Sequence, residues 1–69
     1  MTTMTISVPE IHCDHCKSSI EGALVPLPGV VSALVDIPAR TVTVEVDETI
    51  TGRGRLVAAI EEQGYDVPA

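Results

Sequence analysis

Aromatic side chains are almost absent from this sequence of 69 residues, which has no Phe, no Trp and a single Tyr. The core must therefore be built from aliphatic side chains, and the one aromatic residue, Tyr65, becomes informative. Basic residues are also few, because 4 Lys and Arg stand against 10 Asp and Glu, for a formal net charge of −6. Nucleic acids and anionic membrane surfaces require clustered Lys and Arg, so neither is an expected partner.

Long hydrophobic runs are missing as well. Residues 1–5 have neither the basic nor the apolar region of a secretory signal, and no apolar run approaches the roughly 20 residues that cross a bilayer. We therefore expect one small domain, residues 1–69, in the cytoplasm and without membrane insertion. Thiols stay reduced in that compartment, so cysteines there are expected to be ligands or redox groups.

Both cysteines and both histidines fall within five consecutive residues, His12-Cys13-Asp14-His15-Cys16. A Cys-x-x-Cys pair places two soft thiolates close enough to bind one ion, and soft ligands favour Cu(I) and Zn(II) over hard cations. Three other interpretations stay open: buried small side chains, a redox dithiol and a structural zinc site. A redox motif of the thioredoxin type needs a larger domain, and a closed zinc site needs ligands that do not follow downstream. We therefore expect metal binding through Cys13 and Cys16.

Hydrophobic periodicity predicts the order of the secondary-structure elements. Apolar residues alternate with polar ones in three segments, which predicts strands at 4–8, 30–37 and 41–46, the last two paired as a hairpin. Apolar residues three and four apart predict a helix over about 15–25, capped by Asp14, and a second helix that ends at Gly64. Residues 65–67 are expected to form a short last strand. This order predicts an α+β fold, the ferredoxin-like βαββαβ sandwich, with two helices on one face of an antiparallel sheet.

Three segments carry a resemblance to a known family. They are Val8-x-x-Ile11-His12-Cys13-Asp14-His15-Cys16 at the end of the first strand, Gly29-Val30 before the second, and Ala59-Ile60-Glu61-Glu62-Gln63-Gly64-Tyr65-Asp66-Val67 near the end. With these segments the chain resembles, over nearly its whole length, the heavy-metal-associated domain and within it the small bacterial copper chaperones of the CopZ type. The family usually has Gly-Met where this chain has Glu10-Ile11, and Ile11 is expected to fill the core beneath the loop.

The resemblance implies a carrier and not an enzyme. A chaperone of this kind binds Cu(I) through two thiolates, here those of Cys13 and Cys16. It passes the ion by ligand exchange to the metal-binding domain of a copper-transporting P-type ATPase or to a copper-responsive regulator, and a metal-bridged homodimer is an alternative assembly. Zn(II) or another soft metal is the alternative cargo, although Zn(II) prefers four ligands and would here need water, His15 or a second molecule. A small thiol-disulfide redox protein is the remaining alternative.

Three further side chains are candidate auxiliary residues of the site. His15 lies between the two cysteines at a helix start, where it is expected to tune their protonation. His12 is expected to face solvent. Tyr65 resembles the tyrosine that bacterial chaperones hold over the site, with its hydroxyl near the thiolates. The positive end of the helix is expected to lower the thiol pKa of Cys16 from about 8.5.

Overall fold

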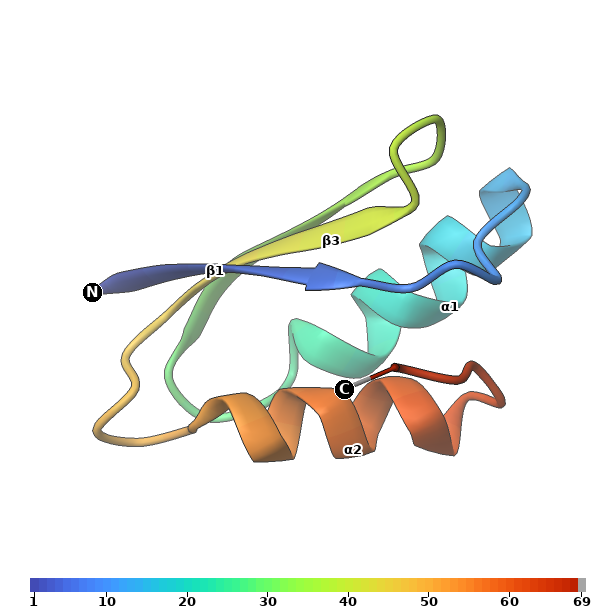
Figure 1. Ribbon diagram of the computed structural model, residues 1–69. Helices are drawn as coiled ribbons and strands as arrows, with labels where there is room; N and C mark the ends of the chain where they lie inside the picture. The colour runs from blue at the N-terminus through green and yellow to red at the C-terminus, as the bar shows by residue number, and fades with distance from the viewer. Residues whose placement is uncertain (69) are drawn as a thin grey trace.

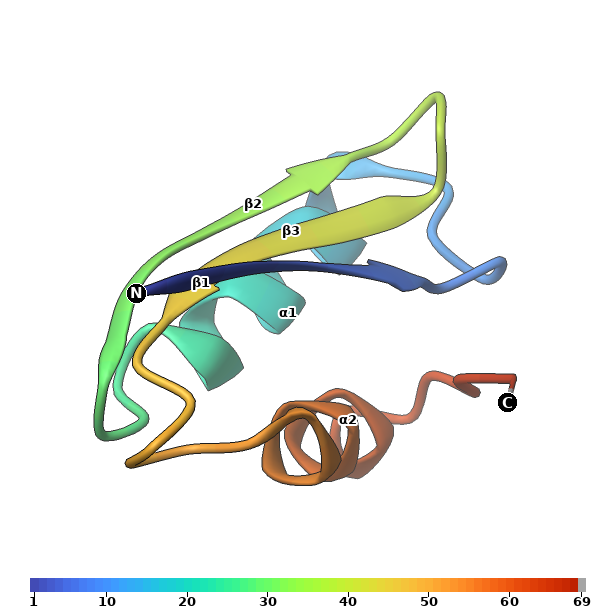
Figure 2. The same cartoon turned by 60° about the vertical axis from the view of Figure 1, so that its left-hand side comes forward.

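An antiparallel sheet covered on one face by two helices makes up the protein in a computed structural model that describes residues 1–68 (Figure 1). The elements in chain order are β1 (Thr2–Ser7), α1 (Asp14–Leu24), β2 (Val30–Asp36), β3 (Thr41–Val46) and α2 (Arg53–Glu62). β3 lies between β1 and β2, and Figure 2 shows both helices on the same side of the sheet. The predicted ferredoxin-like class and the predicted hairpin are confirmed.

The inner face of the sheet is aliphatic because its strands alternate with period two. β1 pairs with β3 from Thr2 opposite Val46 to Ser7 opposite Thr41, and β2 pairs with β3 on its other side. This register places a set of fully or almost fully buried side chains beneath the helices: Ile6, Val35, Val42, Val44 and Val46. Thr3, Thr5 and Ser7 of β1 alternate with them and face outward, where they are exposed.

The helices complete the core with residues spaced three and four apart. Cys16, Ile20 and Leu24 of α1 are buried, as are Leu56, Ala59 and Ile60 of α2. Ile11, in the loop before α1, is fully buried in the same cluster, as the sequence predicts. Neither helix in the described part of the chain is long and apolar enough to cross a membrane.

The segment after α2 differs from the expectation. The sequence predicts a short last strand at 65–67, but residues 65–68 are irregular. The reason is visible at Asp66, whose backbone N–H donates to the Glu10 carboxylate at 2.5 Å and not to a carbonyl of β1. Pro68 has no N–H to donate, so it adds nothing to a ladder. The described sheet therefore has three strands.

Three connections meet at one end of the sandwich, which we call the loop end: residues 8–13, 37–40 and 64–66. In Figure 1 this end lies on the right. The backbone N–H of Val8 donates to the Arg40 carbonyl at 2.9 Å, and the Arg40 guanidinium donates to the Pro9 carbonyl at 3.4 Å. The hydrogen bond from Asp66 to Glu10 joins the third connection to the first. Residues distant in sequence are thus held beside the start of α1.

A carboxylate joins α1 to the edge strand β2. Glu21 accepts hydrogen bonds from the Val35 backbone N–H and from the Lys17 ammonium group, both at 2.9 Å. Burial opposes ionisation of Glu21, but the hydrogen bonds from Lys17 and Val35 outweigh it and hold the pKa of this carboxyl below its ordinary value. The charged form of Glu21 is therefore the form that stabilises the fold.

Replacing this carboxylate tests the contact. We expect Glu21→Ala to lower the free energy of unfolding by about 1–2 kcal/mol at pH 7, because the Val35 N–H loses its acceptor. The pKa is lower in the folded than in the unfolded chain, so the contribution is present above pH ~4.3 and is lost as the pH falls through the folded value. Urea denaturation of wild type, Glu21→Ala and an exposed control, Glu48→Ala, at several pH values measures this. A difference between wild type and Glu21→Ala that stays constant into acid would contradict it.

Candidate metal site

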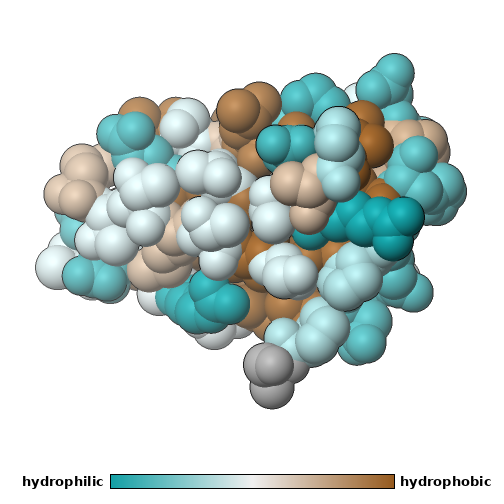
Figure 3. All heavy atoms as spheres, turned by 45° about the horizontal axis from the view of Figure 1, so that its top comes forward, coloured by the Kyte–Doolittle hydropathy of each residue, from teal (hydrophilic) through white to brown (hydrophobic). Residues whose placement is uncertain are grey.

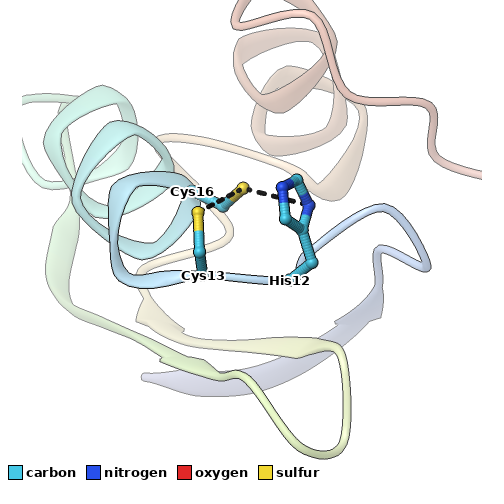
Figure 4. A group of neighbouring side chains, drawn as sticks. All are labelled: His12, Cys13 and Cys16. Carbon is cyan, nitrogen blue, oxygen red and sulfur yellow. Dashed lines mark hydrogen bonds between the residues drawn. The ribbon is translucent and has the colours of Figure 1, made fainter.

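The connection from β1 to α1 brings both cysteines to the start of the helix. Cys13 is the N-cap residue with extended backbone (φ −157°, ψ 170°), and Cys16 lies in the first helical turn. Asp14, predicted as the cap, is instead the first helical residue, because the chain leaves the extended conformation one residue earlier. A cap and a residue three positions later lie on the same side of the first turn. The two sulfur atoms are accordingly 3.7 Å apart (Figure 4).

The two thiols differ in how firmly they are held. Cys16 is only 2% exposed and belongs to the aliphatic core, whereas Cys13 is half-buried and packs against that core from outside. Both are free thiols. A ligand coming from solvent therefore reaches Cys13 first, and Cys16 has little room to move.

His12 is the side chain whose position the sequence did not foresee. It is exposed, as predicted, yet its ring turns toward the cysteines (Figure 4). The Nδ1–H group donates to the Glu10 carbonyl at 2.8 Å, and Nδ1 lies 3.7 Å from the Cys16 sulfur. The ligand atoms of His12, Cys13 and Cys16 all lie within 4.8 Å of one another. They form a group of soft and borderline donors that suits Cu(I) or Zn(II).

His15, which the motif spacing favoured as the tuning residue, is exposed on α1 and is not a member of this group. The difference follows from backbone direction. Successive residues of a helix are turned by about 100°, so with Cys16 directed into the core, His15 lies to one side of that direction, where it is exposed. His12 precedes the helix, so its direction depends on the path of the loop, for which the sequence carries no periodic signal.

Tyr65 reaches the site from the opposite end of the chain. It is half-buried, and its hydroxyl lies near enough to the Cys16 thiol for each group to shift the pKa of the other. The Tyr65 hydroxyl is the largest cause that lowers the thiol pKa of Cys16 from 9.0 to about 7, followed by the backbone of His12. The same contact raises the pKa of the Tyr65 hydroxyl, because a nearby thiolate disfavours a second negative charge.

The sequence predicted the direction of the Cys16 shift and named a different main cause. It attributed the lower pKa to the end of the helix, whereas a side chain from the far terminus contributes most. A thiol with a pKa of about 7 is roughly half in the thiolate form at neutral pH, and the thiolate is the form that binds metals.

Comparison with known proteins agrees with this geometry. Residues 5–66 match the heavy-metal-associated domain family. The chain is 43% identical over 67 residues to the copper chaperone CopZ of Staphylococcus haemolyticus, covering 97% of this chain and 98% of that one.

Two solved structures have the same fold. A CopZ metallochaperone superposes with a TM-score of 0.93 at 37% identity, covering 97% of this chain and 100% of the other. The N-terminal domain of a potential copper-translocating P-type ATPase from Bacillus subtilis, in its Cu(I)-loaded state, has a TM-score of 0.87 at 28% identity, covering 93% and 80%. The paired cysteines, the fold and these likenesses together place this chain in the heavy-metal-associated domain family, whose chaperones carry metal and are not enzymes.

Proposed function

We propose that the protein is a copper chaperone that binds Cu(I) between the thiolates of Cys13 and Cys16 and hands it on by ligand exchange. One observation carries the proposal: two free thiols lie 3.7 Å apart at the loop end, one of them with a pKa of about 7. The names of the similar proteins support copper as the cargo. Both cysteines are free thiols, and thiols stay reduced in the cytoplasm, so we place the protein in that compartment.

The separation of the sulfurs bears on how the ion is held. Metal–sulfur bonds of about 2.3 Å would place two sulfurs ~4.6 Å apart in a linear site and ~4.0 Å apart in a trigonal one. The observed separation is 3.7 Å. Linear Cu(I) therefore requires the sulfurs to move apart by about 0.9 Å, and Cys13 is the one that moves, because Cys16 is packed in the core. Zn(II), the alternative cargo, would need a fourth ligand beyond His12, Cys13 and Cys16.

We assign His12 and Tyr65 auxiliary roles around Cys16. The Tyr65 hydroxyl and the His12 backbone both lower the thiol pKa of Cys16, so both favour a thiolate there before metal binds. His12 is held in place by the Glu10 carbonyl and would have to release it to become a third ligand. His15 is exposed on α1 and lies outside the group of His12, Cys13 and Cys16, so we assign it a weaker influence on metal binding.

The proposed receiver of the ion is the metal-binding domain of a copper-transporting P-type ATPase. The likeness of this fold to such a domain supports the proposal, because two similar thiol loops can share one ion during transfer. A copper-responsive regulator is an alternative receiver, and two copies of the chain bridged by the metal are an alternative assembly. Each of these would bind at the loop end, where Cys13 is accessible.

The charge of the loop end indicates what surface the receiver presents. Several exposed acidic residues lie in or beside it: Glu10, Asp14, Glu61, Glu62 and Asp66. Figure 3 shows hydrophilic side chains gathered at the right of the molecule, the end at which Figure 1 places these loops. Two basic residues oppose them: Arg40 lies in the loop end itself, and Lys17 pairs with Glu21 along α1, while Glu62 pairs with Arg55 at 3.4 Å. An acidic surface attracts a basic one and raises the rate of encounter.

The role of the cysteines is tested by single substitutions. We expect Cys13→Ser and Cys16→Ser each to weaken Cu(I) binding by more than a hundredfold, or about 2.7 kcal/mol, in anaerobic competition with a chelator, because one thiolate alone cannot hold the ion. Circular dichroism of metal-free Cys13→Ser should match wild type, since Cys13 lies outside the core. Loss of its fold would show a structural pair instead. Catalytic reduction of a model disulfide by wild type would favour the redox alternative.

The two histidines are matched controls for each other. We expect His12→Ala to weaken Cu(I) binding by up to about tenfold, since the imidazole beside the Cys16 sulfur is lost, and His15→Ala to change it by less than about twofold. Competition titrations of both variants under the same conditions measure the difference. An effect of His12→Ala beyond about a hundredfold would make it a direct ligand, and a larger effect of His15→Ala would reverse the assignment.

Delivery of the ion is tested by stopped-flow transfer to the metal-binding domain of a P-type copper ATPase. We expect the rate to fall as salt shortens the Debye length to ~8 Å or less, because the acidic loop end steers the encounter. The double change Glu61→Lys and Glu62→Lys should slow transfer at low salt and flatten the salt dependence. Equal rates and equal salt slopes for wild type and variant would exclude steering by these two glutamates, and absence of transfer would contradict the proposed delivery.

A further inference from the structure

Glu10 contacts both parts of the site that surround Cys16. Its carboxylate accepts the backbone N–H of Asp66 at 2.5 Å, a hydrogen bond between residues 56 positions apart. Its backbone carbonyl accepts the Nδ1–H of His12 at 2.8 Å. One residue in the loop before α1 is therefore joined to the residue after Tyr65 and to the histidine beside the cysteines.

The backbone at this position does not need glycine. Among the described residues other than glycine, Arg40 has a positive φ and Glu10 does not. The Glu10 side chain is thus accommodated without backbone strain at a position where the heavy-metal-associated family usually has glycine. The carboxylate extends across the loop end to the segment after α2, so the residue adds a contact that glycine at this position would lack.

The segment that Glu10 holds has few other anchors. Residues 65–68 are irregular, so the segment is not fixed by a strand ladder. Tyr65 and Val67 are half-buried against the core, and Asp66 between them is exposed. The Asp66 N–H belongs to the peptide group that follows Tyr65. A fixed acceptor for that N–H therefore restricts the backbone position of Tyr65. A carboxylate is a strong acceptor for this purpose, because hydrogen bonds to a charged group are shorter and stronger than neutral ones.

We propose that Glu10 is a positioning residue that latches the segment after α2 to the thiol loop and so keeps the Tyr65 hydroxyl on the Cys16 sulfur. A second consequence rests on the proposed function: a receiver that binds at the loop end displaces the exposed latch, Tyr65 withdraws, and Cys16 becomes free to exchange its ligand. The hydrogen bond lies at the surface, so opening it requires no disruption of the aliphatic core.

The latch is tested first on the metal-free protein with Glu10→Ala, Glu10→Gln and the distant charge control Glu48→Ala. We expect Glu10→Ala to speed solvent exchange of the Asp66 amide by about tenfold, measured by NMR, and to change the fluorescence of Tyr65, the single aromatic residue. Glu10→Gln keeps an acceptor oxygen and should restore most of the protection. Glu48→Ala should resemble wild type. Equal exchange in Glu10→Ala and wild type would overturn the latch, and so would a Glu10→Gln variant that behaves like Glu10→Ala, because charge alone would then account for the effect.

The second test follows removal of Cu(I) by an excess of chelator. We expect Glu10→Ala to release the ion several-fold faster than wild type and Glu10→Gln, and to have no further effect when added to Tyr65→Phe, because the latch acts through the tyrosine hydroxyl. Equal release rates, or an undiminished effect in the Tyr65→Phe background, would overturn this consequence. If wild type binds no Cu(I), the proposed function fails while the amide and fluorescence measurements still decide whether the latch exists.

Discussion

The burial of Cys16 in the aliphatic core is the contact on which the site depends. A thiol packs there as a small apolar side chain, beside Ile11 and Ile20, and fixes both the start of α1 and the direction of its first turn. Cys13, at the cap, is then placed by the helix geometry without a bond of its own to the core. The site thus combines one sulfur whose position is set by packing with one that can follow an incoming ion.

The polar groups around Cys16 act on protonation and not on packing. With a pKa of about 7 in place of 9.0, the Cys16 thiolate contributes stability that is complete above pH ~9, declines as the pH falls and is absent below about pH 7. Metal binding replaces a proton on this sulfur, so the same hydrogen bonds that favour the thiolate also ease the exchange of proton for metal. The influence of Tyr65 on this sulfur therefore runs through the protonation of Cys16.

The sequence predicted most of the fold and the two cysteines, and the reason lies in the kind of signal each feature leaves. Period-two alternation in 41–46 and the spacing of Cys16, Ile20 and Leu24 report burial directly, and these elements formed as expected. The place of His12 beside the cysteines and the contact between Glu10 and Asp66 depend on the path of irregular backbone. Side-chain periodicity carries no information about such a path. These contacts are therefore visible only in the three-dimensional structure.

The irregular segment 65–68 also affects how the protein behaves at high concentration. Within residues 1–68, β1 has β3 on one side and no strand on the other, and an open strand edge is a site at which identical chains can pair and aggregate. Arg53 donates to the outward carbonyl of Thr5 at 3.3 Å, which blocks part of this edge with a charged side chain. The net charge of −6 adds repulsion between copies. Repulsion between copies and the Arg53 contact therefore protect the open edge of β1, which a fourth strand beside it would have covered with hydrogen bonds.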